Sequence, residues 1–205
     1  MRPLRLLATG VVAASLAGCI SLFPKEQPVQ LYRFGGPPAP APQPGAQAAP
    51  VPVQALAIGF ERAAATDRIL TVAGDEAAYI RSARWVTAAP ALFQAALNQA
   101  FDADPGPARL VAVGEAIRPS YFLKIDVRAF EARYDHGANA APTIVVEVYA
   151  VLSHPADRSL VGEQTFRAAI PAAENRAGAI AIAFGEAVSK DLTALTAWVD
   201  AKAAG

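Results

Sequence analysis

The sequence predicts a mixed α/β (α+β) fold in which two long helices pack on a mixed or antiparallel sheet. Apolar and polar residues alternate over short stretches, which is typical of half-buried strands, and two longer stretches repeat apolar residues every three or four positions, which is typical of amphipathic helices. The chain has 205 residues, of which 54% are hydrophobic and 18% charged. It is therefore long enough to bury one core and too apolar to be disordered.

The charge balance and the cysteine count exclude several classes of function. Lys plus Arg and Asp plus Glu each number 18, so there is no excess of positive charge to attract nucleic acid. A single cysteine, Cys19, excludes an intramolecular disulfide and a cysteine-built metal centre. The two histidines are few for a metal site, and we expect neither a metal nor another cofactor.

Residues 1–18 have the organisation of a bacterial lipoprotein signal peptide. Arg2 and Arg5 give it a positive start, and the apolar stretch that follows is shorter than the roughly 20 residues that a membrane-spanning helix needs. The stretch ends in LAGC, in which small residues precede Cys19, the acceptor for a thioether-linked diacylglycerol. We expect cleavage before Cys19 and acylation, including palmitate, which would anchor the mature protein in a membrane. The alternative is an ordinary signal peptide followed by a chance cysteine.

The second residue of the expected mature chain bears on its location. Ile20 follows Cys19, whereas an aspartate at this position is the pattern that retains lipoproteins in the inner membrane. By this analogy we expect an anchor at the periplasmic face of the outer membrane.

Residues 19–52 are expected to form a lipidated N-terminus. Residues 29–34 alternate like a short strand. Residues 36–52 contain seven prolines in 17 positions, which favours extended polyproline II and predicts a linker with a reach of roughly 50 Å. We interpret this linker as a passive spacer, or as a loop that bulges out of the domain, more readily than as a ligand for a proline-binding domain.

Residues 53–203 are expected to form the folded domain. Within it the alternation slips at Phe130–Glu131, which indicates a β-bulge. A helix over 88–103 would have Thr87 as its cap and Pro90 in its first turn, and a long last helix carries an apolar stripe from Ala177 to Val199. The expected strands are 53–60, 68–72, 77–86, 110–113, 121–129, 144–152 and 160–168.

The chain carries no credible set of catalytic residues. His136 and His154 lie on different connections and are interpreted as exposed loop histidines. Asp126 and Glu147 would lie on facing strands, but each falls in the polar phase of its strand and is better explained by a solvated sheet face. We therefore predict that the protein is not an enzyme.

Several residues at fixed places along the chain resemble the ABC-type transport auxiliary lipoprotein family, the PqiC-type lipoproteins. The resemblance covers nearly the whole chain apart from the proline-rich segment. The residues that carry it, besides Cys19 and the LYRF run that ends at Phe34, are Arg68, Tyr79, Trp85, Pro90, Phe130 and Tyr134. They match structural positions of the family, and none of them is catalytic.

This resemblance implies a fold, a function and partners. The fold would be similar to anticodon-binding and TolB N-terminal domains. The function would be that of a non-catalytic accessory subunit in an intermembrane phospholipid transport system, and the partners would be an ABC permease, an ATPase and a mammalian-cell-entry (MCE) domain protein. The subunit would dock the periplasmic MCE component, and homo-oligomerisation is left open.

Two other hypotheses remain open at this point. One is a general envelope-assembly lipoprotein that binds outer-membrane or peptidoglycan-associated partners without an ABC system. The other is an envelope hydrolase, which the lack of a nucleophile paired with a base disfavours. Neighbouring permease, ATPase and MCE genes would favour the transport hypothesis over the first of these.

Overall fold

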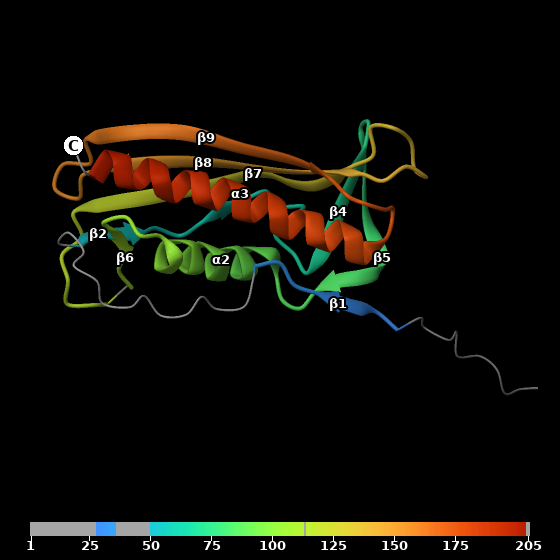
Figure 1. The fold of residues 1–205 in the computed structure, drawn as a ribbon, viewed down its shortest axis with the longest axis horizontal. Coiled ribbons are helices and arrows are strands. Elements are labelled where there is room, and N and C mark those ends of the chain that lie inside the picture. Colours follow the sequence, from blue (N-terminus) through green and yellow to red (C-terminus); the bar gives the residue numbers. More distant parts are fainter. Residues whose placement is uncertain (1–27, 36–49, 113, 204–205) are drawn as a thin grey trace, which may run out of the picture.

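The computed structural model describes residues 28–35, 50–112 and 114–203, and within them nine strands form one mixed sheet with two helices along it (Figure 1). This arrangement confirms the predicted α+β fold. The strands are β1 Gln30–Tyr32, β2 Val51–Ala55, β3 Gly59–Phe60, β4 Arg68–Ala73, β5 Glu76–Trp85, β6 Ala108–Leu110, β7 Tyr121–Arg133, β8 Thr143–Ser153 and β9 Leu160–Pro171. The helices are α2 Ala89–Ala103 and α3 Ala177–Ala203.

Strand β7 organises the sheet. One of its edges pairs along its whole length with β8, which pairs in turn with β9, and both pairings are antiparallel. The other edge is paired by β2, β3 and β4 in succession, all parallel to β7. The predicted single strand over 53–60 is therefore two short strands, because the chain leaves β7 after Ala55 and rejoins it at Gly59.

The N-terminal described residues belong to the same sheet. The strand predicted over 29–34 is β1, which pairs in parallel with the end of β5. Val51 and Pro52, which the sequence assigned to the linker, instead lie in β2. A proline is tolerated there because pairing with β7 starts only at Val53, while the Pro52 carbonyl accepts a hydrogen bond from the Ser120 N–H at 2.7 Å.

The two helices form close to where their patterns placed them. The predicted cap of α2 was wrong: the N-cap is Ala88, not Thr87, and no side chain caps the helix. Pro90 lies in the first turn of α2, where its missing N–H leaves no helical hydrogen bond unmade. Helix α3 packs on β8 and β9 through its apolar stripe and also contacts α2.

Strand boundaries differ from the predicted ones where the chain changes phase. The bulge in β7 lies between Val127 and Ala129, earlier than the predicted Phe130–Glu131, because Val127 and Phe130 are both buried and the extra residue must fall between them. Strand β6 covers 108–110 instead of 110–113, since its partner β2 already begins at Val51. Strand β9 continues past Ala168 to Pro171 opposite the start of β8.

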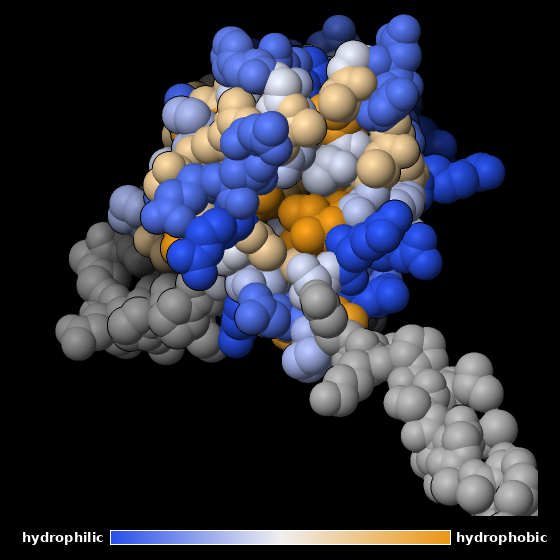
Figure 2. All heavy atoms as spheres, turned by 90° about the vertical axis from the view of Figure 1, so that its right-hand side faces the viewer, coloured by the Kyte–Doolittle hydropathy of each residue, from blue (hydrophilic) through white to orange (hydrophobic). Residues whose placement is uncertain are grey.

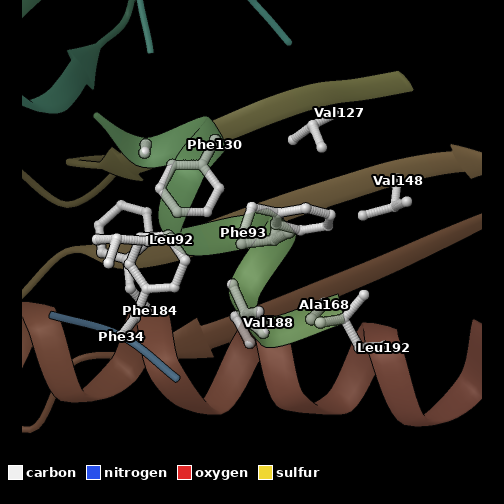
Figure 3. Close-up of a cluster of buried hydrophobic side chains, with 14 of the residues drawn as sticks. Phe34, Leu92, Phe93, Val127, Phe130, Val148, Ala168, Phe184, Val188 and Leu192 are labelled. Carbon is white, nitrogen blue, oxygen red and sulfur yellow. The ribbon is translucent and has the colours of Figure 1, made fainter. Parts of the chain in front are cut away.

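The core lies between the sheet and the helices and contains a cluster of aromatic rings (Figure 3). Phe130 of β7 lies at its centre, with its ring centroid 4.7 Å from that of Phe184 in α3 and 5.1 Å from that of Phe34. Trp85 contacts Phe34 and Phe184 edge to face at 5.0 and 5.2 Å. The cluster therefore ties the segment after β1 to the sheet and to α3.

Candidate functional site

The sheet face that points away from the helices is polar, and several of its charges form ion pairs. Along β7, Leu123, Ile125 and Val127 point into the core, so the residues between them point outward. On this outer face the ion pairs include Lys124–Asp126 at 3.2 Å and Arg167–Glu147 at 2.7 Å, and Arg128 stacks on Tyr149 at 3.8 Å. We interpret this face as solvated and not as a binding site.

The structure separates the titratable residues that the sequence singled out. Asp126 and Glu147 each have a cation as partner and are not aligned across the strands, since Asp126 lies opposite Tyr149. His136 is exposed in a loop, and the ring of His154 lies 5.3 Å from that of Tyr121. Within the described ranges no three His, Cys, Asp or Glu side chains form a group that could hold a metal ion.

Four of the family-motif residues gather around the β4–β5 hairpin and the start of α2. The guanidinium of Arg68 lies 5.2 Å from the ring centroid of Tyr79, whose hydroxyl donates to the Ala63 carbonyl at 3.0 Å. Trp85 is buried, and its backbone N–H donates to the Asp67 carbonyl at 2.7 Å. With Pro90 starting α2 just beyond Trp85, these residues position the hairpin against the helix.

The other two motif residues lie near the end of β7, Phe130 within the strand and Tyr134 just after it. Phe130 is part of the buried aromatic cluster. Tyr134 donates its hydroxyl to Asn175 Oδ1 at 2.8 Å, and Asn175 in turn donates to the Ala138 carbonyl at 2.9 Å. Burial raises the pKa of the Tyr134 hydroxyl above its ordinary value. These contacts fix the loop before α3.

An open apolar groove of about 1150 Å³ lies between α2, α3 and the segment that follows β1, and we call it the inter-helix groove. This segment runs from β1 toward α2 (Figure 1). A Cβ at Gly35 would lie 3.6 Å from the Cβ of Ala96 in α2. The α2 wall consists of Ala96, Gln99, Ala100 and Ala103. The α3 wall includes Gly178, Ala181, Ile182, Gly185, Val188, Leu192 and Thr196.

Small side chains make this groove possible. Gly185 has nothing within 4 Å of where its Cβ would be, and a Cβ at Gly178 would make only ordinary contact with Tyr32 at 3.8 Å. Ile182 stands on the same wall with 66% of its surface exposed. Figure 2 shows the end of the molecule that carries β1 and the start of α3, where apolar residues gather near the centre and hydrophilic residues surround them.

Two basic and two acidic residues line the groove. Arg33 and Lys190 line it, and neither forms a salt bridge with any residue that the structure describes. Glu186 lines it as well, one turn of α3 before Lys190. Asp104 lies at the far end, about 12 Å along α2 from Ala96.

Two carboxylic acids of α3 have raised pKa values. The pKa of Asp200 is raised to about 6, mainly by burial and by a hydrogen bond with Asp104, although the Ala108 N–H donates to Asp200 Oδ1 at 2.8 Å. The pKa of Asp191 is also raised to about 6 by burial, and its Oδ2 has no hydrogen-bond partner among the described residues. Asp191 faces β9, where the Ala168 N–H partly offsets this effect.

The inter-helix groove is a feature that the sequence pattern missed. The apolar stripe of α3 predicts one buried face, but Gly178, Ile182 and Gly185 lie beside that stripe and line the groove. The run of glycine and small residues along α3 was the available signal. It could be interpreted only once the position of α2 was known.

The predicted anchor lies elsewhere in the chain. Cys19 and Ile20 are outside the described residues, as is most of the predicted linker 36–52. Across the described part of the chain, no helix combines the length and the apolar character needed to cross a membrane.

Comparison with known structures shows the same fold in other proteins. Protein XCC0632 from Xanthomonas campestris is 26% identical, with a TM-score of 0.69 over 85% of this chain and 96% of its own. The hypothetical protein CT253 from Chlamydia trachomatis is 10% identical, with a TM-score of 0.52 over 76% of this chain and 98% of its own, and shows the fold alone. No curated protein sequence matches the chain.

The family comparison covers most of the described structure. The model of the ABC-type transport auxiliary lipoprotein component matches residues 32–194, from the end of β1 to well inside α3. The match includes all six motif residues and both walls of the inter-helix groove up to Thr193. The chain therefore belongs to the ABC-type transport auxiliary lipoprotein component family.

Proposed function

We propose that this chain is an outer-membrane-anchored, non-catalytic accessory subunit of an ABC/MCE-type intermembrane phospholipid transport system. In this proposal acylated Cys19 holds the protein at the periplasmic face of the outer membrane. The folded domain then docks the periplasmic MCE component, which works with the ABC permease and ATPase.

The family match over residues 32–194 carries this proposal, because it makes the folded domain the part that serves an ABC-type transporter. Two further observations support it. On the outer sheet face Asp126 and Glu147 each form an ion pair within the chain, and the residues singled out for catalysis are separated. A role in docking requires neither a nucleophile nor a metal.

The domain is expected to bind its partner without the anchor. A chain that starts at Pro28 keeps β1 and Phe34, which belong to the sheet and to the core. Because charges balance over the whole chain, recognition would depend on apolar and hydrogen-bonded contacts, and its salt dependence would be weak.

The test is binding of this chain to the purified periplasmic domain of the MCE protein at about 50 and about 500 mM salt. We expect similar dissociation constants at the two salt concentrations, with no support of transport in cells by the unanchored chain. If the full lipoprotein in detergent binds and the chain from Pro28 binds at neither salt concentration, recognition lies in the N-terminal segment and the proposed docking role of the domain is wrong. Binding to permease, ATPase or MCE protein by neither form would contradict the proposed function itself.

A further inference from the structure

We propose that the inter-helix groove is a binding site for an amphiphile with one aliphatic chain and an anionic head, such as a lysophospholipid or one chain of a phospholipid. The chain would lie along the Ala- and Gly-lined walls of α2 and α3. The head would lie at Arg33 and Lys190. This inference deepens the proposed function. It rests on that function for one point only, namely that the transport system supplies the lipid.

The walls suit a flexible aliphatic chain. They present methyl groups and backbone from Ala96, Ala100 and Gly185, with Ile182, Val188 and Leu192 as the larger apolar side chains. Tyr32 and Phe34 are the only aromatic residues that line the groove among the described residues, and the apolar walls alternate with polar side chains such as Gln99, Ser189 and Thr193. Burial of aliphatic groups on such walls is favourable without any fixed geometry.

The length of the groove matches the length of a lipid chain. Its α3 wall runs from Gly178 to Thr196, which corresponds to about 27 Å of helix. The hydrocarbon core of a bilayer is about 30 Å thick, so one acyl chain is about 15 Å long. The groove can therefore hold a whole chain with space for a head group beyond it.

The charged residues at the rim of the groove favour an anionic head group. Arg33 and Lys190 make no salt bridge within the described part of the chain, whereas Lys124 and Arg167 on the outer sheet face are each paired with a carboxylate. Glu186 reduces the positive charge of this rim to a net value of one, and Asp104 is displaced to the far end beside Asp200. A phosphate or carboxylate group would complement the two cations. A zwitterionic head group would complement them less well.

Gly185 allows the groove to be filled without disturbing the fold. A Cβ at this position meets nothing within 4 Å, and leucine has a higher helix propensity than glycine. Gly185→Leu should therefore fold as well as the wild type while its side chain occupies the place of the ligand. Ala194→Leu is the matched control, because Ala194 is exposed on α3 and does not line the groove.

The test uses the mature chain carrying Cys19→Ser, so that it can be purified without detergent, and measures binding of palmitoyl lysophosphatidylglycerol by titration calorimetry. We expect Gly185→Leu to weaken binding about tenfold or more, which corresponds to about 1.4 kcal/mol, and Ala194→Leu to leave it unchanged. The double variant Arg33→Gln/Lys190→Gln should lose the preference for this lipid over lysophosphatidylcholine, whereas Arg81→Gln, on exposed β5 surface, should keep it.

Several results would overturn the inference. Equal binding by the wild type and by Gly185→Leu would place the lipid elsewhere. Binding of glycerol 3-phosphate as strongly as of the lysolipid would show that the groove contributes nothing. A change in oligomeric state by Gly185→Leu, with lipid binding unchanged, would make the groove a contact between copies of the chain.

The inference and the proposed function can fail separately. If the wild type binds the MCE protein but does not bind the lysolipid, only the inference is contradicted. Intact lipid binding with no binding to transporter components would contradict only the proposed function.

Discussion

Trp85 shows how one residue joins distant parts of the chain. It ends β5, pairs through its backbone with β1, and places its ring against Phe34 and Phe184. Only 2% of its surface is exposed. Its removal would leave a large cavity at the junction of the sheet, the segment after β1 and α3.

We therefore expect Trp85→Ala to lower the free energy of unfolding by about 3–5 kcal/mol, as urea denaturation would measure. Val86→Ala is the control, because the neighbouring side chain is 51% exposed and should change stability by less than about 1 kcal/mol. A Trp85→Ala protein with normal stability and no transport activity would identify Trp85 as a partner contact instead of a core residue.

The two acids with raised pKa values make stability depend on pH. An acid whose pKa is higher in the folded than in the unfolded state binds its proton more tightly when folded. The pKa values of Asp191 and Asp200 are both raised to about 6, so the stabilising effect of their protonation is complete below about pH 4 and is lost as the pH rises through about 6.

We expect the free energy of unfolding of the wild type to fall between about pH 4 and pH 6 from these two groups, and the fall to be smaller in Asp191→Asn and in Asp200→Asn. Asp200 is partly solvated, so its share should be roughly 1 kcal/mol or less. Urea midpoints across this pH range measure the effect. Parallel pH profiles for the wild type and the double variant would show that neither acid is responsible.

At the scale of an element, the start of α2 lacks a stabilising side-chain cap. Its N-cap Ala88 has φ −55° and ψ 139°, which is suitable for a capping residue, yet it offers no side-chain acceptor. Because Pro90 has no N–H, the available donor is the N–H of Ala91, which now bonds to the Ala88 carbonyl at 3.0 Å. A carboxylate at this position would also interact favourably with the helix dipole.

We expect Ala88→Asp to raise the free energy of unfolding by about 0.5–1 kcal/mol, and Thr87→Ala to change it by less than about 0.5 kcal/mol. Thermal unfolding of both variants at neutral pH measures this. If Thr87→Ala instead costs about 1 kcal/mol and Ala88→Asp gains nothing, Thr87 caps the helix in solution.

At the scale of the whole molecule, membrane attachment is predicted to depend on one thiol. Cys19→Ser removes the only acceptor for the expected thioether, so incorporation of radiolabelled palmitate should be lost and the protein should leave the membrane fraction. Ala17→Ser, which keeps a small residue before the cleavage site, is a control that should still be labelled. Equal labelling of the wild type and of Cys19→Ser would contradict the prediction.

The destination of the anchored protein is predicted to depend on the next residue. Ile20→Asp should shift the protein from the outer towards the inner membrane, as separation of the two membranes on a density gradient would measure. Ile20→Val is the matched control and should not change the distribution. An unchanged distribution for Ile20→Asp would mean that other signals decide the location.

The sequence alone was sufficient for the α+β class, the stripe of α3 and the long strands β7 and β8, because period-2 and period-3.6 patterns are local. It also supported the family, since the residues that carry the resemblance stand at fixed places along the chain. It was less reliable at boundaries: whether Pro52 belongs to a strand depends on where β7 starts to pair, and whether Thr87 caps a helix depends on which backbone turn begins it.

Only the tertiary structure decided which small residues are exposed together. In sequence, the alanines of α2 and the glycines of α3 are compatible with close packing of the two helices as well as with an open groove. The segment that ends at Gly35 reaches α2 through the contact of Phe34 with Trp85 and Phe130, contacts between residues far apart in the chain. The groove, and the two cations on its rim, exist because of those long-range contacts, which no local periodicity records.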